Sequence, residues 1–300
     1  MYAGPIIDAH THLWDLGMNR HPWLSPRGTV AALAGLEKLR TDFLVEDYLR
    51  DSAGQNIVAS VHIEALWDPA DPLGETRWLE TLDKSRGVAV RYTAAAPLGT
   101  PGAARVLEAQ AAFTRVAGIR AILSFHPTEP AKSFAARGDI AIDPAWRADV
   151  ARLIPLGLNL ELMMYPYQLA DVLALARHLP DLQIIVNHCA SPIDRDAEGM
   201  RRWQESVRQL ATCPNIALKV SNITAYVPGA PYDEVRAIAE HCIGCFGTQR
   251  TMLATDWPVA RLNAGFADIY DTFRRITDGY SADEQRALFH DNAQRFYRLP

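Results

Sequence analysis

The chain has 300 residues, of which 49% are hydrophobic and 22% charged, values typical of a globular protein with one large domain or two small ones. Its formal net charge of −5 gives no reason to expect binding to nucleic acid or to an anionic membrane. It has no run of about eighteen apolar residues, so we expect no membrane span. The first residues lack the basic start and cleavage pattern of a signal peptide, so we expect a cytoplasmic location.

Short segments rich in Val, Ile and Leu alternate with amphipathic segments along the chain. The segments predicted as strands are Pro5–Ala9, Ile57–Glu64, Val88–Ala94, Gly118–Phe125, Leu158–Met163, Ile184–His188, Asn215–Val220 and Thr251–Thr255. Those predicted as helices are Arg77–Ser85, Ala103–Ala117, Ala145–Leu156, Gln168–His178, Gly199–Thr212 and Tyr232–Cys242, with further helices in Ala264–Leu299. Repeated strand–helix units imply parallel strands joined by helical crossovers. Eight such units predict an α/β protein with a (β/α)8 barrel, or TIM barrel.

We expect a single barrel domain over residues 1–300, with an insertion after the first strand, at about residues 16–56, that could form a lid. A doubly wound α/β fold is the alternative, but that fold usually has a glycine-rich phosphate-binding turn after its first strand. Here His10-Thr11-His12 occupies that place. The sequence also has no G-x-S-x-G segment, so a serine-hydrolase nucleophile is not expected.

The first predicted strand ends in two histidines separated by one residue. Residues two apart in an extended strand point to the same face, so His10 and His12 are expected side by side, with Asp8 on the same face below them. Neutral imidazole is a common zinc ligand. Two exposed loop histidines are the alternative, but the preceding hydrophobic strand favours a site.

In a barrel, alternate residues of each strand face the axis. If the apolar residues face the helices, the inward residues are Ser60, His62, Glu64, Arg91, Arg120, Ser124, His126, Asn159, Glu161, Lys219 and Ser221. For the sixth strand, either Asn187 or His188 could face inward. Buried charge is unfavourable unless it is paired, so we expect Arg91 or Arg120 to pair with Glu161. The groups expected at the strand ends, where this fold carries its active sites, are His10, His12, Glu64, His188 and Asp256.

The four cysteines include a lone C-x-x-C, Cys242 and Cys245. A structural zinc site would need a second pair, so we expect these two to be buried small residues on a helix. The remaining histidines are expected to be structural, and they include His62, His126, His178, His241 and His290.

Several motifs together resemble a known family. They are Asp8-Ala9-His10-Thr11-His12, His21-Pro22-Trp23-Leu24, Glu75-Thr76-Arg77-Trp78-Leu79, Gly118-Ile119-Arg120, Asn187-His188-Cys189-Ala190-Ser191-Pro192, Lys219-Val220-Ser221, Ala254-Thr255-Asp256-Trp257-Pro258 and Asn292-Ala293-Gln294-Arg295-Phe296-Tyr297. In this order and spacing they resemble the amidohydrolase superfamily. The chain looks most like the lactonase branch that includes 2-pyrone-4,6-dicarboxylate lactonase, L-fuconolactonase and L-rhamnonolactonase.

The resemblance implies a barrel with hydrolytic chemistry at its mouth. His10 and His12 match the first-strand ligands of the family, His188 its later-strand histidine and Asp256 its strand-eight aspartate. The fifth predicted strand, Leu158–Met163, has neither lysine nor histidine, so a two-metal site is not expected. We expect one divalent metal, zinc, or none, because some members of the branch resemble metal-free enzymes.

The predicted function is hydrolysis of a small lactone, of a sugar-acid type, with Asp256 as general base. Zinc would be held by His10, His12, His188 and Asp256, with Glu64 and His188 as further catalytic candidates. Without metal, protonated histidines could stabilise the oxyanion. The candidate substrate-binding residues are Trp14, Arg77, Arg120, Lys219 and Trp257, and Trp23 could also stack on a sugar ring.

Two other functions remain open at this point. One is a mononuclear zinc decarboxylase, which uses a similar set of residues, and the other is a non-catalytic sugar-acid-binding protein. Asp256 could also be only a helix N-cap, and His188 only a core histidine. The expected partner is a small-molecule lactone, and the chain could form a homodimer.

Overall fold

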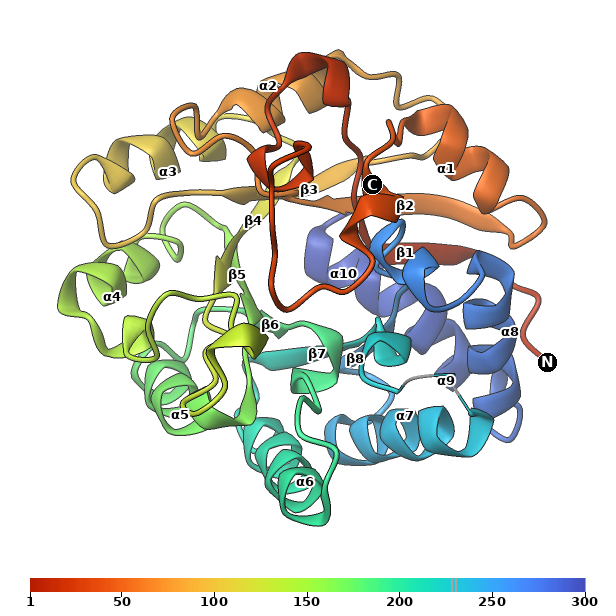
Figure 1. The fold of residues 1–300 in the computed structure, drawn as a ribbon. Helices are drawn as coiled ribbons and strands as arrows, with labels where there is room; N and C mark the ends of the chain where they lie inside the picture. Colours follow the sequence, from red (N-terminus) through yellow and green to blue (C-terminus); the bar gives the residue numbers. More distant parts are fainter. Residues whose placement is uncertain (228, 230, 300) are drawn as a thin grey trace.

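The computed structural model describes residues 1–227, 229 and 231–299. Neighbouring strands pair in parallel in the order β1 to β8. Their bounds are β1 Ile6–Thr11, β2 Ile57–Ile63, β3 Arg91–Ala95, β4 Val116–Ile122, β5 Asn159–Met163, β6 Ile184–Val186, β7 Ile216–Val220 and β8 Thr251–Leu253. The predicted (β/α)8 barrel is confirmed, with the strands at the centre and the helices around them (Figure 1).

The ring closes between β1 and the residues that follow β8. The amide of His12 donates to the carbonyl of Trp257 (2.7 Å), and the amide of Asp256 donates to the carbonyl of His10 (2.9 Å). These two bonds bring the Asp8–His12 motif and the Ala254–Pro258 motif together at one end of the barrel.

Ten α-helices lie among the described residues. Their bounds are α1 Val45–Asp51, α2 Gly74–Thr81, α3 Ala103–Ala111, α4 Pro144–Ala151, α5 Leu169–His178, α6 Ala197–Ala211, α7 Tyr232–Phe246, α8 Phe266–Ile276, α9 Ala282–Arg286 and α10 Asn292–Tyr297. Each of the longer helices buries one apolar face; on α8 these are Phe266, Ile269, Tyr270 and Phe273, at the spacing of a single helix face. Within the described part of the chain, no helix is long and apolar enough to cross a membrane.

Some predicted boundaries differ from the observed ones. The helix predicted over Ala103–Ala117 ends at Ala111, because the Val116–Ile122 segment, which begins inside that prediction, pairs with β3 and β5 as strand β4. Between β1 and β2 the chain forms three short 3-10 turns and α1, and in Figure 1 this red and orange segment passes over the open end of the barrel.

Apolar side chains fill the end of the barrel opposite the histidines. Apolar residues of six strands pack there against Ala293 and Tyr297 of α10; they are Ile7, Ala9, Val61, Ile63, Ala117, Ile185, Ala217, Met252 and, directly after β8, Ala254. The side-chain amide of Asn159 donates to the carbonyl of Phe296 (2.7 Å), which fastens α10 to the barrel. A second and larger apolar cluster lies between the strands and the outer helices.

The first strand has an irregularity that separates Asp8 from the two histidines. After Asp8, three residues of β1 advance against two of β2, and such a bulge changes the alternation of side chains. Asp8 points outward and accepts hydrogen bonds from the hydroxyls of Tyr48 (3.1 Å) and Thr255 (2.6 Å). Burial raises the pKa of Asp8 to about 6, although these hydrogen bonds lower it. The prediction that Asp8 shares the face of His10 and His12 is therefore wrong.

The predicted alternation on β2 is also wrong. Val61 and Ile63 face the axis, where they belong to the apolar filling of the barrel. Ser60 and His62 face the helices, and His62 Nε2 lies 3.1 Å from a carboxylate oxygen of Glu75 on α2. On β2 the residues that face the axis are apolar and those that face the helices are polar, the reverse of the expected pattern, so polarity alone misidentifies the two faces of this strand.

Candidate active site

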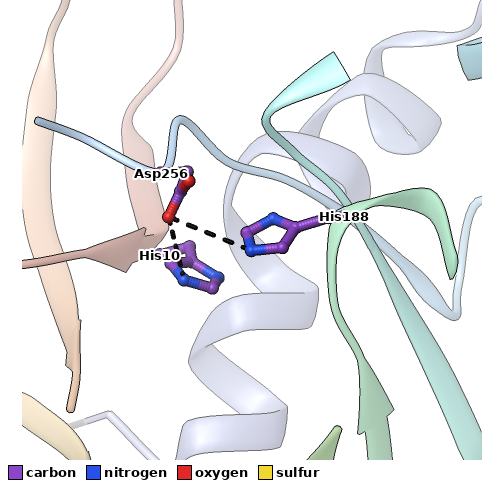
Figure 2. Close-up of side chains that lie close together, drawn as sticks. All are labelled: His10, His188 and Asp256. Carbon is purple, nitrogen blue, oxygen red and sulfur yellow. Dashed lines mark ion pairs between the residues drawn. The ribbon is translucent and has the colours of Figure 1, made fainter. Parts of the chain in front are cut away.

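Four predicted site residues meet at the carboxyl ends of the strands. His10 and His12 come from the end of β1, His188 from a short turn after β6, and Asp256 from the segment after β8. The Asp256 Oδ1 atom lies 3.0 Å from His12 Nε2, 3.2 Å from His10 Nε2 and 4.0 Å from His188 Nε2. Figure 2 shows Asp256 directing one carboxylate oxygen towards the rings of His10 and His188.

The backbone at two of these positions adopts a strained conformation. His188, Cys189, Ala190 and Ser191 have φ between 51° and 57°, and Asp256 has φ of 68°. Left-handed backbone is unfavourable by roughly 1–2 kcal/mol for each residue other than glycine, and it persists only where the surroundings determine it. Here the Trp203 indole donates to the carbonyl of Cys189 (2.7 Å) and holds the turn that presents His188.

The proton on the His12 ring can be placed from its partners. Nδ1 lies 2.8 Å from the carbonyl oxygen of Ile63, which can only accept, so Nδ1 carries a proton. Nε2 then faces Asp256 Oδ1, another acceptor. Either Nε2 carries a second proton and donates it to Asp256, or its lone pair is available to a cation bound beside Asp256.

The other two histidines are held in the uncharged form by their surroundings. Burial lowers the pKa of His10 well below its usual range, and the neighbouring Lys219 lowers it further. Burial also lowers the pKa of His188 to about 4, against the opposing effect of Asp256. The Nδ1 atom of His188 lies 2.9 Å from the hydroxyl of Ser221, which can donate to it or accept from it.

The carboxyl group of Asp256 remains ionised although it is only 3% exposed. Burial raises its pKa, but the nearby His188, the hydrogen bond from His12 and the charge of Arg120 together bring it below the usual range. All three histidine contacts reach Oδ1, so Oδ2 is oriented away from them. The site therefore offers an acceptor that is charged at neutral pH.

A buried ion pair lies directly beneath the histidines. Glu161 and Lys219 are both completely buried and in direct contact, and the Lys219 Nζ atom is 3.4 Å from His10 Nδ1. Glu161 also accepts hydrogen bonds from Asn187 (2.7 Å), Thr93 (2.9 Å) and Tyr297 (2.8 Å). Burial raises the pKa of Glu161, but the charge of Lys219 and the hydrogen bonds from Lys219, Asn187 and Tyr297 bring it below its usual value.

The predicted pairing of Glu161 with an arginine is wrong. Arg91 lies at the other end of the barrel, where it donates to the carbonyl of Arg298. Arg120 instead pairs with Glu64, with 3.3 Å between Nη1 and Oε1. Lys219 is the residue that pairs with Glu161, because it projects from β7 towards the axis at the level of Glu161.

A cavity of about 140 Å³ opens above Asp256, His12 and His188. Its walls are mainly apolar and come from the insertion, the ends of β2, β4 and β5, and the segments after β6 and β7. Arg120 and Glu64 also line this cavity and add polar groups to those of Asp256 and the histidines. A mostly apolar pocket with a few convergent polar groups is the usual form of a small-molecule site.

The donor set is suited to one divalent cation. Ligand atoms of His10, His188 and Asp256 lie within 4.8 Å of one another. His10 Nε2 is buried without a hydrogen-bond partner and lies 3.2 Å from Asp256 Oδ1. His12 Nε2, beside the same Asp256 oxygen, could be a further ligand. Three imidazoles and a carboxylate are a common set for zinc.

Comparison with known proteins agrees with this geometry. The Amidohydro_2 family, described as amidohydrolase, matches residues 7–299. The chain belongs to the amidohydrolase family. This amidohydrolase is 35% identical to the uncharacterized protein y4mH of Sinorhizobium fredii, over 98% of both chains. It is 28% identical to an L-fucono-1,5-lactonase of Burkholderia multivorans, over 98% of this chain and 96% of that one.

The fold of this amidohydrolase is also similar to solved structures. A zinc-bound amidohydrolase of Burkholderia multivorans superimposes with a TM-score of 0.83 at 23% identity, over 99% of this chain and 100% of that one. At this identity the likeness concerns the fold. The zinc belongs to that protein, and its bearing on the present chain is taken up below.

Of the five predicted substrate-binding residues, the amidohydrolase places one, Arg120, in the cavity wall. Trp14 is completely buried beneath the insertion and donates to the carbonyl of Thr41 (2.7 Å). Trp257 is turned outward, and its indole donates to Asp51 (3.0 Å). Two other residues have their own partners: Lys219 is bound to Glu161, and Arg77 is on the surface with Asp71.

The structure adds residues that sequence reasoning missed. Met163, Tyr165 and Tyr226 line the cavity, as do Val30 and Leu33 of the insertion. The signal for Met163 was present, since it ends strand β5 on the same face as Glu161. The insertion residues carry no such signal, because an irregular segment has no periodicity that relates it to the barrel.

A second group of possible metal ligands lies outside the site, at His126, Glu129 and Asp194. The amides of Thr128 and Glu129 donate to His126 Nδ1, so the proton is on Nε2 and points at Asp194, 3.0 Å away. Lys132 already pairs with both acids. This group is a surface ion-pair network, in agreement with the prediction that His126 is structural.

The cysteine pair lies on a helix as expected, but Cys245 is only half-buried. Cys242 and Cys245 both lie on α7 as free thiols, and Cys242 is completely buried. Neither belongs to a group of possible metal ligands in the described part of the chain.

Proposed function

We propose that this amidohydrolase hydrolyses a small lactone derived from a sugar acid, with Asp256 as general base. The observation that carries the proposal is the ionised, buried carboxylate of Asp256 beside three imidazole rings, at the floor of a cavity. The relative named L-fucono-1,5-lactonase supports a cyclic ester as substrate class.

Asp256 would start the reaction. Because its pKa is lowered, it is charged at neutral pH and can take a proton from a water molecule in the cavity. As this proton moves to Oδ2, the water oxygen bonds to the lactone carbonyl carbon, and the carbonyl electron pair moves onto the carbonyl oxygen. When the carbonyl re-forms, the bond to the ring oxygen breaks and Asp256 returns its proton to that oxygen. The product is the open hydroxy acid, with one water added.

The histidines would bind and orient the reacting groups. His188 borders the cavity, and with Ser221 donating to its Nδ1 the ring proton would be on Nε2, where it would donate to the carbonyl oxygen as it gains charge. A divalent cation held by His10, His188 and Asp256, with His12 as a further ligand, would supply Lewis acidity and a more acidic water. The zinc-bound neighbour supports zinc as that cation.

Arg120 and Glu64 would face the substrate on the other side of the cavity. Both are more than 90% buried and form an ion pair at 3.3 Å. We propose that Arg120 binds a substrate oxygen and that Glu64 positions it, since the second oxygen of Glu64 is engaged by the amide of Leu66 (2.9 Å).

The test measures hydrolysis of a panel of sugar-acid lactones through the acid that is released. The main variant is Asp256→Asn. Asp181→Asn is the matched control, because Asp181 is exposed and precedes β6 at the opposite end of the barrel. We expect Asp256→Asn to lower kcat about 10²–10⁴-fold, the usual range for a general base, and Asp181→Asn to leave it unchanged.

Three results would contradict the proposal. Full turnover by Asp256→Asn would show that Asp256 is not the general base. Release of carbon dioxide from an aromatic acid without lactone hydrolysis would make the protein a decarboxylase, and tight binding of sugar acids without turnover would make it a binding protein.

A further inference from the structure

A second cavity, larger than the first, lies beside the candidate active site. Its volume is about 520 Å³, against about 140 Å³ for the cavity at Asp256. We call it the side chamber; it is lined by the segments after β2 and β3, the end of β4, and Ile140 and Trp146. Both cavities share the same partition, formed by Trp23, Glu64, Leu66, Arg120 and Ile122.

The lining of the side chamber is apolar beyond this partition. It is formed by alanines, prolines, Leu98, Ile140, Trp67 and Trp146, and the Trp67 indole N–H is buried without a partner. Beside the two indoles, its polar side chains are Asp68 and Thr100. These two are already engaged, because Asp68 pairs with Arg20 (3.2 Å) and the hydroxyl of Thr100 donates to the carbonyl of Pro97 (2.7 Å). Such a lining favours an apolar ligand, since hydroxyl groups placed there would lose their hydrogen bonds to water.

Small residues at the end of β3 leave room for the chamber. Ala95 ends this strand and Ala96 follows it, whereas the residue paired with Ala95 on β4 is Arg120. In barrels of this type the carboxyl ends of the strands face the substrate. Two methyl groups at this level therefore open space for the substrate next to the chemistry.

Within the partition, Arg120 has hydrogen-bond donors that lack a strong acceptor. The Arg120 side chain is 8% exposed, and its Nη1 donates to the carbonyl and the carboxylate of Glu64. Its Nη2 reaches only the weak acceptor sulfur of Met163 (3.5 Å), and its Nε has no partner. A buried donor without a partner is unfavourable, and an oxygen atom of a ligand that accepts from it would remove this penalty.

Leu66 adds an apolar contact to the same partition. It has a φ of 54° and a side chain that stays 36% exposed, facing both cavities. Its exposed side chain is therefore available for apolar contact with a ligand in either cavity.

We propose that the side chamber binds an apolar arm of the substrate, so that the preferred substrate is a lactone with an aryl or alkyl arm of several carbons. The lactone carbonyl lies at Asp256, and an oxygen of the substrate accepts from Arg120. The arm extends past the partition residues into the side chamber. This inference rests on the proposed lactone hydrolysis and extends it to a substrate class.

The test uses matched lactones that differ only in the arm. The pairs are δ-valerolactone with δ-decalactone, and γ-butyrolactone with γ-phenyl-γ-butyrolactone. Each buried methylene contributes about fourfold in binding, so we expect kcat/KM to be at least tenfold higher for the lactone with the arm. Calorimetric titration of the same pairs measures binding even where turnover is slow.

Ala96→Phe narrows the side chamber. We define the arm ratio as kcat/KM for the lactone with the arm divided by kcat/KM for its partner without the arm, and we expect this variant to lower the ratio about tenfold. Ala237→Phe, on the exposed surface of α7, is the matched control and should keep the ratio. If circular dichroism shows that Ala96→Phe is unfolded, Leu98→Trp takes its place in the same lining.

The possible failures are distinguishable. The proposed role of the side chamber would be wrong if kcat/KM and affinity were equal within each pair, or if the folded chamber variant kept the arm ratio. The proposal of lactone hydrolysis would then still stand. Absence of hydrolysis for these and for the sugar-acid lactones would overturn the proposed function, and the calorimetric ratio would then decide on the chamber alone.

Discussion

Replacing Lys219 by methionine tests the buried ion pair that supports the histidines. Lys219 and Glu161 have no exposed surface, and burial lowers the pKa of Lys219 to about 8 against the attraction of Glu161. Removing one partner of a buried pair usually destabilises a protein by about 3–5 kcal/mol, because the other charge remains without compensation. Three hydrogen bonds to Glu161 remain, from Asn187, Thr93 and Tyr297, so we expect the lower end, about 3 kcal/mol.

The assay is the free energy of unfolding from urea titration at neutral pH. Lys38→Met, at an exposed position, is the matched control and should change it by less than about 0.5 kcal/mol. In the double variant with Glu161→Gln, both charges are absent, so the two losses should not add, with a coupling of about 1–3 kcal/mol. A loss below about 1 kcal/mol for Lys219→Met, or strictly additive losses, would refute the reasoning.

Two further predictions concern protonation and metal. His21 is 4% exposed with neither ring nitrogen hydrogen-bonded, and burial lowers its pKa from 6.5 to about 4. The unfolded protein therefore binds more protons than the folded protein between these pH values, and the His21 contribution lowers the free energy of unfolding by about 2 kcal/mol from pH 7 to pH 5. Denaturant titration of His21→Phe should show a smaller decrease over the same range. A decrease equal to that of the parent protein would contradict this prediction. Zinc added to chelator-treated protein should raise the Tm, by an amount equivalent to about 2.7 kcal/mol at 100 times the Kd, and His188→Asn should reduce the rise, whereas an equal rise would exclude His188 as a ligand.

The sequence by itself determined the strand–helix alternation and the groups at the strand ends. On β5 and β7 the alternation of apolar and polar residues correctly predicts that Glu161 and Lys219 face the axis, because leucines, isoleucines and valines mark the outer face there. His10 and His188 could likewise be located from their positions at the ends of hydrophobic segments. These are local patterns, and local patterns can be read along a chain.

Tertiary structure alone decided which of these groups meet. The bulge in β1 turns Asp8 away from the histidines, and ring closure through the backbone brings Asp256 to His12, 244 residues away. It also decided that Trp257, the next residue, faces outward. A sequence records which side chains are available, but the register between strands, which depends on hydrogen bonds across the whole ring, fixes their partners.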